Sequence, residues 1–184
     1  MKLLLLCDRE SVGNGLRGSY LDLLANAGHD VATVTLSREE IKPCLGCFGC
    51  WIKTPGQCVI GDEANSIAEK QMRSDVVVLL SKITFGGFSA DVKSYLDRSI
   101  QNIASDFEVY KGEMRHKMRY ARFPVNIVVG YGDASEPEQQ TFIHLAQRNA
   151  LNMRPANLLA LITQSGGTIE KTCRPILELL EASA

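Results

Sequence analysis

Residues 75–98, which read DVVVLLSKITFGGFSADVKSYLDR, decide the fold class of this chain. Their first part, Asp75–Leu80, is a continuous apolar run, which is typical of a strand that helices bury on both faces. Ser89 is placed to cap a helix in which Val92 and Tyr95 begin an apolar series at three- and four-residue spacing. A buried strand, a glycine-rich loop and an amphipathic helix in succession predict one unit of a parallel α/β sheet.

The same alternation continues along the chain. Strands are predicted at 2–7, 29–36, 75–80, 125–129 and 157–163, and helices at 19–27, 64–72, 89–103, 136–152 and 169–180. The charged stretch 105–123 follows neither the helical nor the strand period and is interpreted as a solvated connection. Five strands alternating with five helices predict a three-layer α/β sandwich, in which a five-stranded parallel sheet carries helices on both faces. Ligands of such folds bind beyond the carboxyl ends of the strands, here at the loops 8–18, 81–88 and 130–135.

The composition indicates one globular domain without a strongly charged partner. The chain has 184 residues, of which 45% are hydrophobic, so we expect a single domain, 1–184, with a cysteine-rich insertion at about 42–62. Twenty basic and 21 acidic side chains give a net charge of −1 and form no long run, which argues against a nucleic-acid partner. The apolar start at 3–6 is too short for an export signal and no stretch approaches a membrane span, so we expect a cytoplasmic protein with no membrane partner.

A glycine motif follows the first predicted strand. Gly13–Gly18 matches the GxGxxG spacing of dinucleotide-binding loops, but five residues separate it from the strand, and the second strand ends in Ser37-Arg38 without the expected acid. Two interpretations are stronger: a flexible turn, or a cradle whose backbone N–H groups hold one phosphate. A receiver-type acidic pocket is disfavoured, because Ser81 stands where an aspartate would end the third strand.

The loop after the third strand suits a flat ligand. Its paired glycines, Gly86 and Gly87, let the backbone approach a ring closely, and Phe85 and Phe88 can wall that ring. Packing in the core is the alternative for each phenylalanine.

This loop and the helix after it resemble a known flavoprotein family. Lys93, Asp97 and Arg98 match the pattern after the flavin-binding loop of the NADPH-dependent FMN reductase family, within the flavodoxin-like superfamily. The resemblance implies a flavodoxin-like sheet of order 2-1-3-4-5, bound FMN, reduction by NADPH or NADH, and a homodimer or a tetramer of dimers. Our candidates for FMN contact are Arg9, Ser11, Asn14 and Gly15 at the phosphate, and Thr84, Phe85, Gly86, Gly87, Phe88, Gly130, Tyr131 and Gly132 at the ring. No acid–base side chain need be catalytic, because the flavin carries the chemistry.

One residue departs from the family pattern. Glu10 stands in the first loop, where family members carry mainly Ser, Thr and Asn. A carboxylate beside a phosphate repels it, so we expect weaker FMN binding than is usual in the family.

Four of the six cysteines crowd into a short segment. Cys44, Cys47, Cys50 and Cys58 form a CxxCxxC motif with a fourth cysteine after seven residues, a spacing that lets successive thiolates face one centre. The segment resembles the compact motif of iron-sulfur flavoproteins, which implies a four-iron four-sulfur cluster that exchanges electrons with FMN. Zinc, and free or reversibly oxidised thiols near the flavin, are the alternatives. The remaining two, Cys7 and Cys173, are interpreted as core residues.

These features favour an FMN-dependent oxidoreductase, a flavin or quinone type of reductase that takes electrons from NAD(P)H and gives them to a small-molecule or protein acceptor. The alternative is an electron carrier that passes single electrons between an iron-sulfur cluster and FMN. A binding module without flavin is the third possibility, which the Glu10 loop keeps open.

Overall fold

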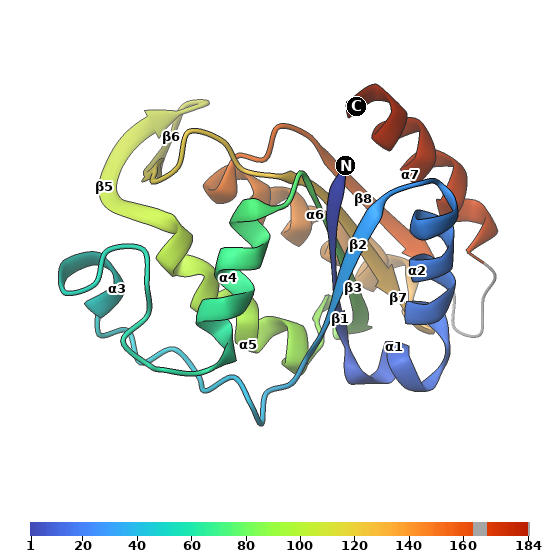
Figure 1. Ribbon diagram of the computed structural model, residues 1–184, viewed down its shortest axis with the longest axis horizontal. Helices are drawn as coiled ribbons and strands as arrows, with labels where there is room; N and C mark the ends of the chain where they lie inside the picture. The colour runs from blue at the N-terminus through green and yellow to red at the C-terminus, as the bar shows by residue number, and fades with distance from the viewer. Residues whose placement is uncertain (164–168, 184) are drawn as a thin grey trace.

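Five apolar runs form the parallel strands of one central sheet in the computed structural model, which describes residues 1–163 and 169–183 (Figure 1). Their order across the sheet is β2-β1-β3-β7-β8. Counted among the parallel strands alone, this is the predicted order 2-1-3-4-5, and the flavodoxin-like α/β class is confirmed. The bounds are β1 (Lys2–Asp8), β2 (Asp30–Leu36), β3 (Val76–Thr84), β7 (Val125–Tyr131) and β8 (Leu158–Thr163).

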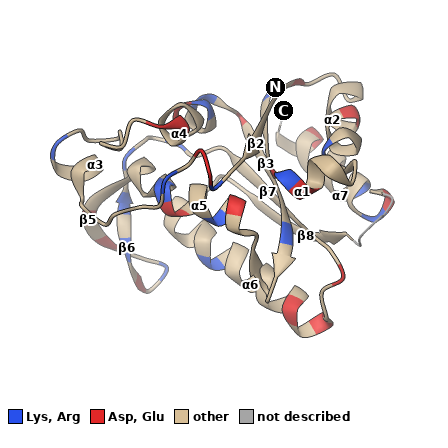
Figure 2. Ribbon diagram, turned by 90° about the horizontal axis from the view of Figure 1, so that it is seen from below, with Lys and Arg blue, Asp and Glu red and all other residues tan. Residues whose placement is uncertain are grey.

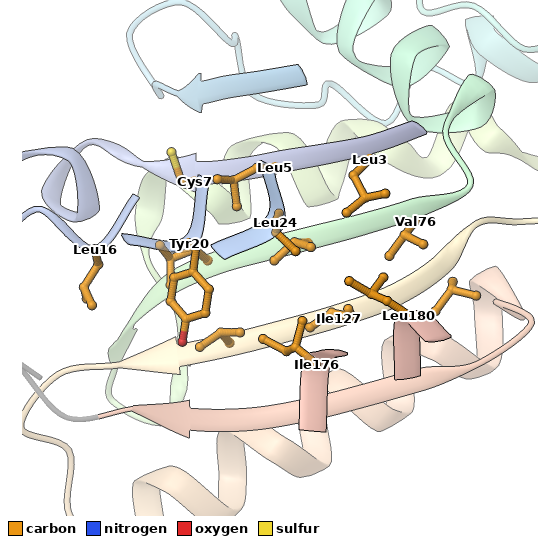
Figure 3. Close-up of a cluster of buried hydrophobic side chains, with 14 of the residues drawn as sticks. Leu3, Leu5, Cys7, Leu16, Tyr20, Leu24, Val76, Ile127, Ile176 and Leu180 are labelled. Atoms are coloured by element: carbon orange, nitrogen blue, oxygen red, sulfur yellow. The ribbon is translucent and has the colours of Figure 1, made fainter. Parts of the chain in front are cut away.

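One face of the sheet packs against two helices. Figure 3 shows this core, in which Leu3 and Leu5 of β1 lie on the same side as Leu24, Ile176 and Leu180. All five side chains are almost completely buried. Alternate residues of each strand supply this layer, as the two-residue period of a strand requires. The two helices are α2 (Leu16–Asn26) and α7 (Glu170–Ser183).

The other face packs against three helices. Leu4 and Leu6 of β1 point to this side and join Ile67, Val92 and Phe142 from the helices. Ser89 caps the middle helix by accepting a hydrogen bond from Val92 N, as predicted. The helices are α4 (Glu63–Arg73), α5 (Ala90–Arg98) and α6 (Glu136–Met153), so the expected three-layer arrangement is present.

The segment after β1 is helical, which corrects the predicted glycine-rich loop at 8–18. Asp8 accepts a hydrogen bond from Ser11 N at 3.0 Å and thereby caps the short helix α1 (Arg9–Gly13). A turn at Gly15, with φ of +81°, then leads directly into α2. The helix predicted at 19–27 therefore begins three residues earlier than expected, at Leu16. The prediction was wrong because an aspartate at the end of the strand is a good cap for an earlier helix.

The loop expected at 81–88 is a β-hairpin. Strand β3 continues to Thr84 and turns at Phe85 and Gly86, which have φ of +49° and +75°. It then pairs in antiparallel register with β4 (Gly87–Phe88). Positive φ at both central residues is typical of tight hairpin turns that match the strand twist. The predicted ring-binding segment is therefore held by sheet hydrogen bonds.

A hairpin and the cysteine segment lie together at one end of the molecule (Figure 1). The stretch 105–123 is not a simple connection, as was expected, because it contains most of the antiparallel pair β5 (Ile103–Tyr110) and β6 (Glu113–Met118). The alternation was hidden because charged residues such as Glu113 and Arg115 lie on the partly buried face, whereas Val109 and Met114 are exposed. The 3₁₀-helix η1 (Ser99–Asn102) leads into this hairpin, and the short helix α3 (Gly49–Ile52) lies in the cysteine segment.

Ion pairs fasten the hairpin to α6. Glu113 of β6 accepts hydrogen bonds from Arg148 at 2.6 and 2.8 Å, and it also pairs with Arg115. These contacts, led by those from Arg148, lower the pKa of Glu113 to about 2. Arg154 pairs with Glu108 of β5 at 2.6 Å. The hairpin is thus anchored on its α6 side through charged groups.

The cysteines outside the cluster segment have different surroundings. Cys7 is fully buried in the core, as predicted. Cys173 is only partly buried and donates a hydrogen bond to the carbonyl of Glu170, so its assignment to the core was wrong. Within the described ranges, the helices are too short or too polar to cross a membrane.

Candidate functional site

Asp8 organises the carboxyl edge of the sheet. Its side chain is buried where β1, β3 and β7 lie next to each other. Oδ1 accepts hydrogen bonds from Ser11 N at 3.0 Å and from the Tyr131 hydroxyl at 2.6 Å, and Oδ2 accepts one from Lys82 N at 2.7 Å. Burial, together with the hydrogen bond to this carboxylate, raises the pKa of Tyr131 far above its usual range. One buried side chain therefore joins the ends of three strands.

Ion pairs cover this edge beside α1, where Figure 2 shows basic and acidic segments next to each other. Glu10 accepts a hydrogen bond from Lys82 Nζ at 2.7 Å. Arg9 Nε lies 3.1 Å from Oδ2 of Asp91. Burial opposes the ionisation of Asp91, but hydrogen bonds from backbone N–H groups and from Arg9 outweigh it and lower the pKa of Asp91. Arg9 and Lys82 are consequently each paired with a carboxylate.

The structure brings the predicted phosphate residues together, but it uses their hydrogen-bonding groups inside the segment. Ser11 is buried, and its Oγ donates to the carbonyl of Asp8 at 2.7 Å. Asn14 Oδ1 accepts a hydrogen bond from the first residue of α2 at 3.1 Å. The backbone N–H of Gly15 donates to a carbonyl of α1 at 3.3 Å. The segment is a capped helix and turn, not an open cradle.

The two phenylalanines of the β3–β4 hairpin have opposite positions. Phe85 is 94% exposed at the turn, whereas Phe88 is buried and meets the ring of Phe142 edge-on at 4.9 Å. Phe88 thus has the packing role that was left open as the alternative. Thr84 precedes the turn and is exposed, and Phe85 projects into solvent from a fixed backbone.

The segment after β7 lies beside this hairpin, because Lys82 pairs with Tyr131 in the sheet register. Gly130 is required for packing, since a Cβ there would lie 2.7 Å from Cε1 of Phe142. The Tyr131 hydroxyl bonds to Asp8 in the core. Gly132 has φ of +119° and begins the turn away from the sheet. All three of these predicted ring residues are buried.

The cysteine segment encloses a small cavity. The residues that line it include all four cysteines of the motif, Cys44, Cys47, Cys50 and Cys58. Burial, and then the neighbouring thiols led by that of Cys58, raise the pKa of Cys50. In the part of the chain that the structure describes, no three His, Cys, Asp or Glu side chains converge closely enough to ligate a metal ion. The four thiols therefore share one cavity without a preformed metal geometry.

Arg98 lines the cysteine cavity and stabilises the segment around it. Its side chain is fully buried and donates to both oxygens of Asp62 at 2.8 and 2.9 Å, as well as to the carbonyls of Lys42 and Ile60. Burial opposes the ionisation of Asp62, but the hydrogen bonds from Arg98 and from backbone N–H groups outweigh it and lower the pKa of Asp62. Arg98 also lines the cavity next to Cys58. It joins both ends of the cysteine segment to α5.

The family is decided by a profile comparison. A family profile described as NADPH-dependent FMN reductase matches residues 1–164. The chain belongs to the NADPH-dependent FMN reductase family. The family expected from the sequence is thereby confirmed.

Curated relatives of this FMN reductase family member are iron-sulfur flavoproteins. One from Methanocaldococcus jannaschii is 37% identical over 79 residues, which cover 43% of this chain and 40% of the relative. Another, from Methanosarcina thermophila, is 31% identical over 83 residues, which cover 45% of this chain and 42% of the relative. These matches span less than half the length of either relative.

Solved structures share the fold of this family member at low sequence identity. An NAD(P)H:quinone oxidoreductase from Methanothermobacter marburgensis aligns with a TM-score of 0.63 and 15% identity over 100% of this chain and 92% of that one. An azoreductase from Bacillus anthracis aligns with a TM-score of 0.63 and 14% identity over 100% and 97%. Both likenesses concern the fold alone.

FMN, the cofactor named by the family, fits one half of the carboxyl edge. At the ring end, Phe85 offers an exposed aromatic face on the turn between β3 and β4. At the phosphate end, two of the groups that would hold a dianion are engaged, because Ser11 N donates to Asp8 and Arg9 donates to Asp91. The ring end therefore suits an isoalloxazine, whereas the phosphate end does not suit FMN.

Sequence reasoning missed an aromatic series that joins the cysteine segment to the β5–β6 hairpin. The rings of Phe48 and Trp51 stack at 5.3 Å, Trp51 meets His116 at 4.9 Å, and His116 meets Phe107 at 4.3 Å. Trp51 Nε1 also donates to two carbonyls at the start of the hairpin. The signal was weak, because these residues are far apart in the chain and the hairpin itself was not predicted.

A larger cavity of about 350 Å³ lies between the sheet and helices α5 and α6. Its lining is mainly apolar and includes Tyr95 and Leu145, with His116 at the hairpin side. Ile100 lines both this cavity and the cysteine cavity. The sequence gives no sign of it, because the residues that surround the space come from elements spread along the chain from β1 to β8.

Proposed function

We propose that this chain is a flavin-dependent oxidoreductase that takes electrons from NADPH or NADH and passes them to a small-molecule or protein acceptor. The observation that carries the proposal is Phe85, which is 94% exposed at the carboxyl edge of a sheet of this family. An exposed aromatic side chain on a hairpin held by sheet pairing is pre-organised for stacking on a flat ring. A bound flavin supplies two-electron redox chemistry, and the protein supplies orientation and exclusion of water.

The chain's own contribution is rigid positioning. The turn at Phe85 and Gly86 is fixed by the β3–β4 pairing, and behind it Phe88 packs on Phe142. Asp8 ties the neighbouring strand ends together through three hydrogen bonds. We also propose that the protein acts as a homodimer, as the family resemblance implies.

The first prediction concerns Phe85. Phe85→Ala is expected to weaken flavin binding about threefold to tenfold, because one aromatic stacking contact is lost. Phe85→Trp should retain the binding. The measurement is isothermal titration calorimetry with riboflavin, followed by NAD(P)H oxidation with menadione as the acceptor. Phe107→Ala is the matched control, since Phe107 is also exposed but lies on the other hairpin. Absence of any flavin-dependent NAD(P)H oxidation in the wild-type protein would refute the proposed function.

The second candidate is an electron carrier that holds a four-iron four-sulfur cluster at Cys44, Cys47, Cys50 and Cys58. The specific observation is that all four side chains line one cavity, and the donor set suits such a cluster. The cavity must close further around the cluster, because the thiols do not converge in the described structure. Arg98 and its partners hold both ends of the segment near each other for this purpose.

Reconstitution with iron and sulfide tests the carrier. After anaerobic incubation, the wild-type protein is expected to retain about four irons per chain. Cys47→Ser should lose most of this iron, because one thiolate ligand is removed. Cys173→Ser is the control, since Cys173 lies on α7 outside the cavity and should not change the iron content. Equal iron content in the two variants would refute the proposed cluster site, and the reductase would remain as the proposed function.

A further inference from the structure

The carboxyl edge carries a selectivity that the family resemblance alone does not supply. FMN differs from riboflavin by one phosphate, which carries a charge of about −2 near neutral pH. A site that holds FMN must therefore provide free N–H donors and positive charge at the end of the ligand away from the ring. Both would have to come from α1 and the residues around it.

Backbone donors at the cap of α1 and at the turn after it are already engaged. The cap position of α1 is taken by Asp8, whose Oδ1 accepts from Ser11 N at 3.0 Å. The next N–H groups close the helix and its turn, because Asn14 N donates to the carbonyl of Glu10 and Gly15 N to that of Val12. The side chain of Asp8 thus occupies the place of an anion and is itself held by three donors.

Two of the cations at this edge, Arg9 and Lys82, are already paired with carboxylates. Arg9 pairs with Asp91 and with Glu39, each at 3.1 Å, and Lys82 pairs with Glu10 at 2.7 Å. A phosphate that approached α1 would have to displace these carboxylates. It would also meet the buried charge of Asp8, which cannot move away without opening three strand ends.

We propose that this edge selects flavin without its phosphate, so that riboflavin binds at least as tightly as FMN and acts as an exchangeable ligand. The inference rests on the proposed flavin-dependent function and assigns its ligand class. Binding comes from the exposed ring of Phe85, which stands on a turn held by the β3–β4 pairing. Asp8, Glu10 and Asp91 act as specificity-determining residues, because each occupies a donor or cation that a phosphate would need.

The test compares riboflavin and FMN by isothermal titration calorimetry with the full chain. Binding is measured at low ionic strength and again in 0.5 M salt, where the Debye length is about 3–5 Å. Riboflavin should bind as tightly as FMN or more tightly. Salt should strengthen FMN binding, because it screens the repulsion, and should leave riboflavin binding unchanged. Glu10→Gln removes one negative charge and frees Lys82, so FMN affinity should rise roughly threefold or more while riboflavin affinity stays constant.

Glu178→Gln is the matched control, because it removes a carboxylate from a surface ion pair on α7 and should change neither affinity. If FMN binds more tightly than riboflavin, the selectivity is refuted and the flavin-dependent function stands. If neither flavin binds, both the function and the selectivity are refuted. If Glu10→Gln raises both affinities equally, the carboxylate does not discriminate and the inference is also wrong.

Discussion

Arg98→Leu is expected to lower the free energy of unfolding by about 3–5 kcal/mol, because it leaves the carboxylate of Asp62 without its partner in a buried site. The Arg98 side chain is 0% exposed and that of Asp62 is 8% exposed. The substitution also leaves the carbonyls of Lys42 and Ile60 without their donor. The cysteine segment, which these carbonyls flank, should loosen. Urea unfolding followed by circular dichroism measures the change in free energy.

Two controls separate this effect from a general loss of charge. Arg174→Leu makes the same replacement in an exposed pair with Glu178 and should cost less than about 0.5 kcal/mol. Combining Arg98→Leu with Asp62→Leu should recover part of the loss, since no charge is then left buried. A cost as small as that of Arg174→Leu would show that the buried pair does not support the segment.

The same pair gives a pH dependence of definite sign. The pKa of Asp62 in the folded protein is lower than its usual value near 4. The stabilisation is therefore fully present above that usual value and is lost as the pH falls through the lower, folded-state pKa. Acid unfolding of Arg98→Leu should show less of this dependence than the wild type does.

Phe142→Ala should lower the free energy of unfolding by about 3–5 kcal/mol, because it opens a cavity in the core behind the hairpin. Phe142 is completely buried and meets the ring of Phe88 at 4.9 Å. The loss of this contact should also make the β3–β4 hairpin less rigid. Thermal and urea unfolding give the stability, and hydrogen exchange of the hairpin amides gives the local effect.

Gly130 provides a sharper test of this packing. A Cβ at Gly130 would lie 2.7 Å from Phe142 Cε1, so Gly130→Ala alone should be destabilising. In the Phe142→Ala background the added methyl group enters empty space. The double variant should therefore be more stable than the sum of the single effects predicts, by about 0.5–3 kcal/mol. Strict additivity would show that the two residues do not meet.

The parallel sheet could be predicted because its signal is local. Each buried strand is a run of apolar residues, and each covering helix repeats its apolar residues at three and four, as at Val92 and Tyr95. The order of strands followed from the family resemblance. The β5–β6 hairpin was missed because its strands carry many charged residues, such as Glu113 and Arg115, that pair with one another or with α6.

The candidate site was predicted less completely, because its decisive contacts join distant parts of the chain. Nothing in the sequence around Asp8 shows that its carboxylate reaches Lys82 and Tyr131. The pairing of Arg98 with Asp62 was equally hidden, although Arg98 was singled out by the family pattern. Phe85 and Phe88 were treated alike in the sequence, yet the hairpin exposes one and buries the other.

Trp51 is the only tryptophan among the 184 residues, and its indole N–H is bonded to the carbonyls of Ile100 and Ile103. Its ring also touches Phe48 and His116. Light that excites tryptophan selectively therefore reports on the cysteine segment and the hairpin without a label. A fluorescence transition at lower denaturant than that of the backbone would reveal that this end of the molecule melts before the sheet.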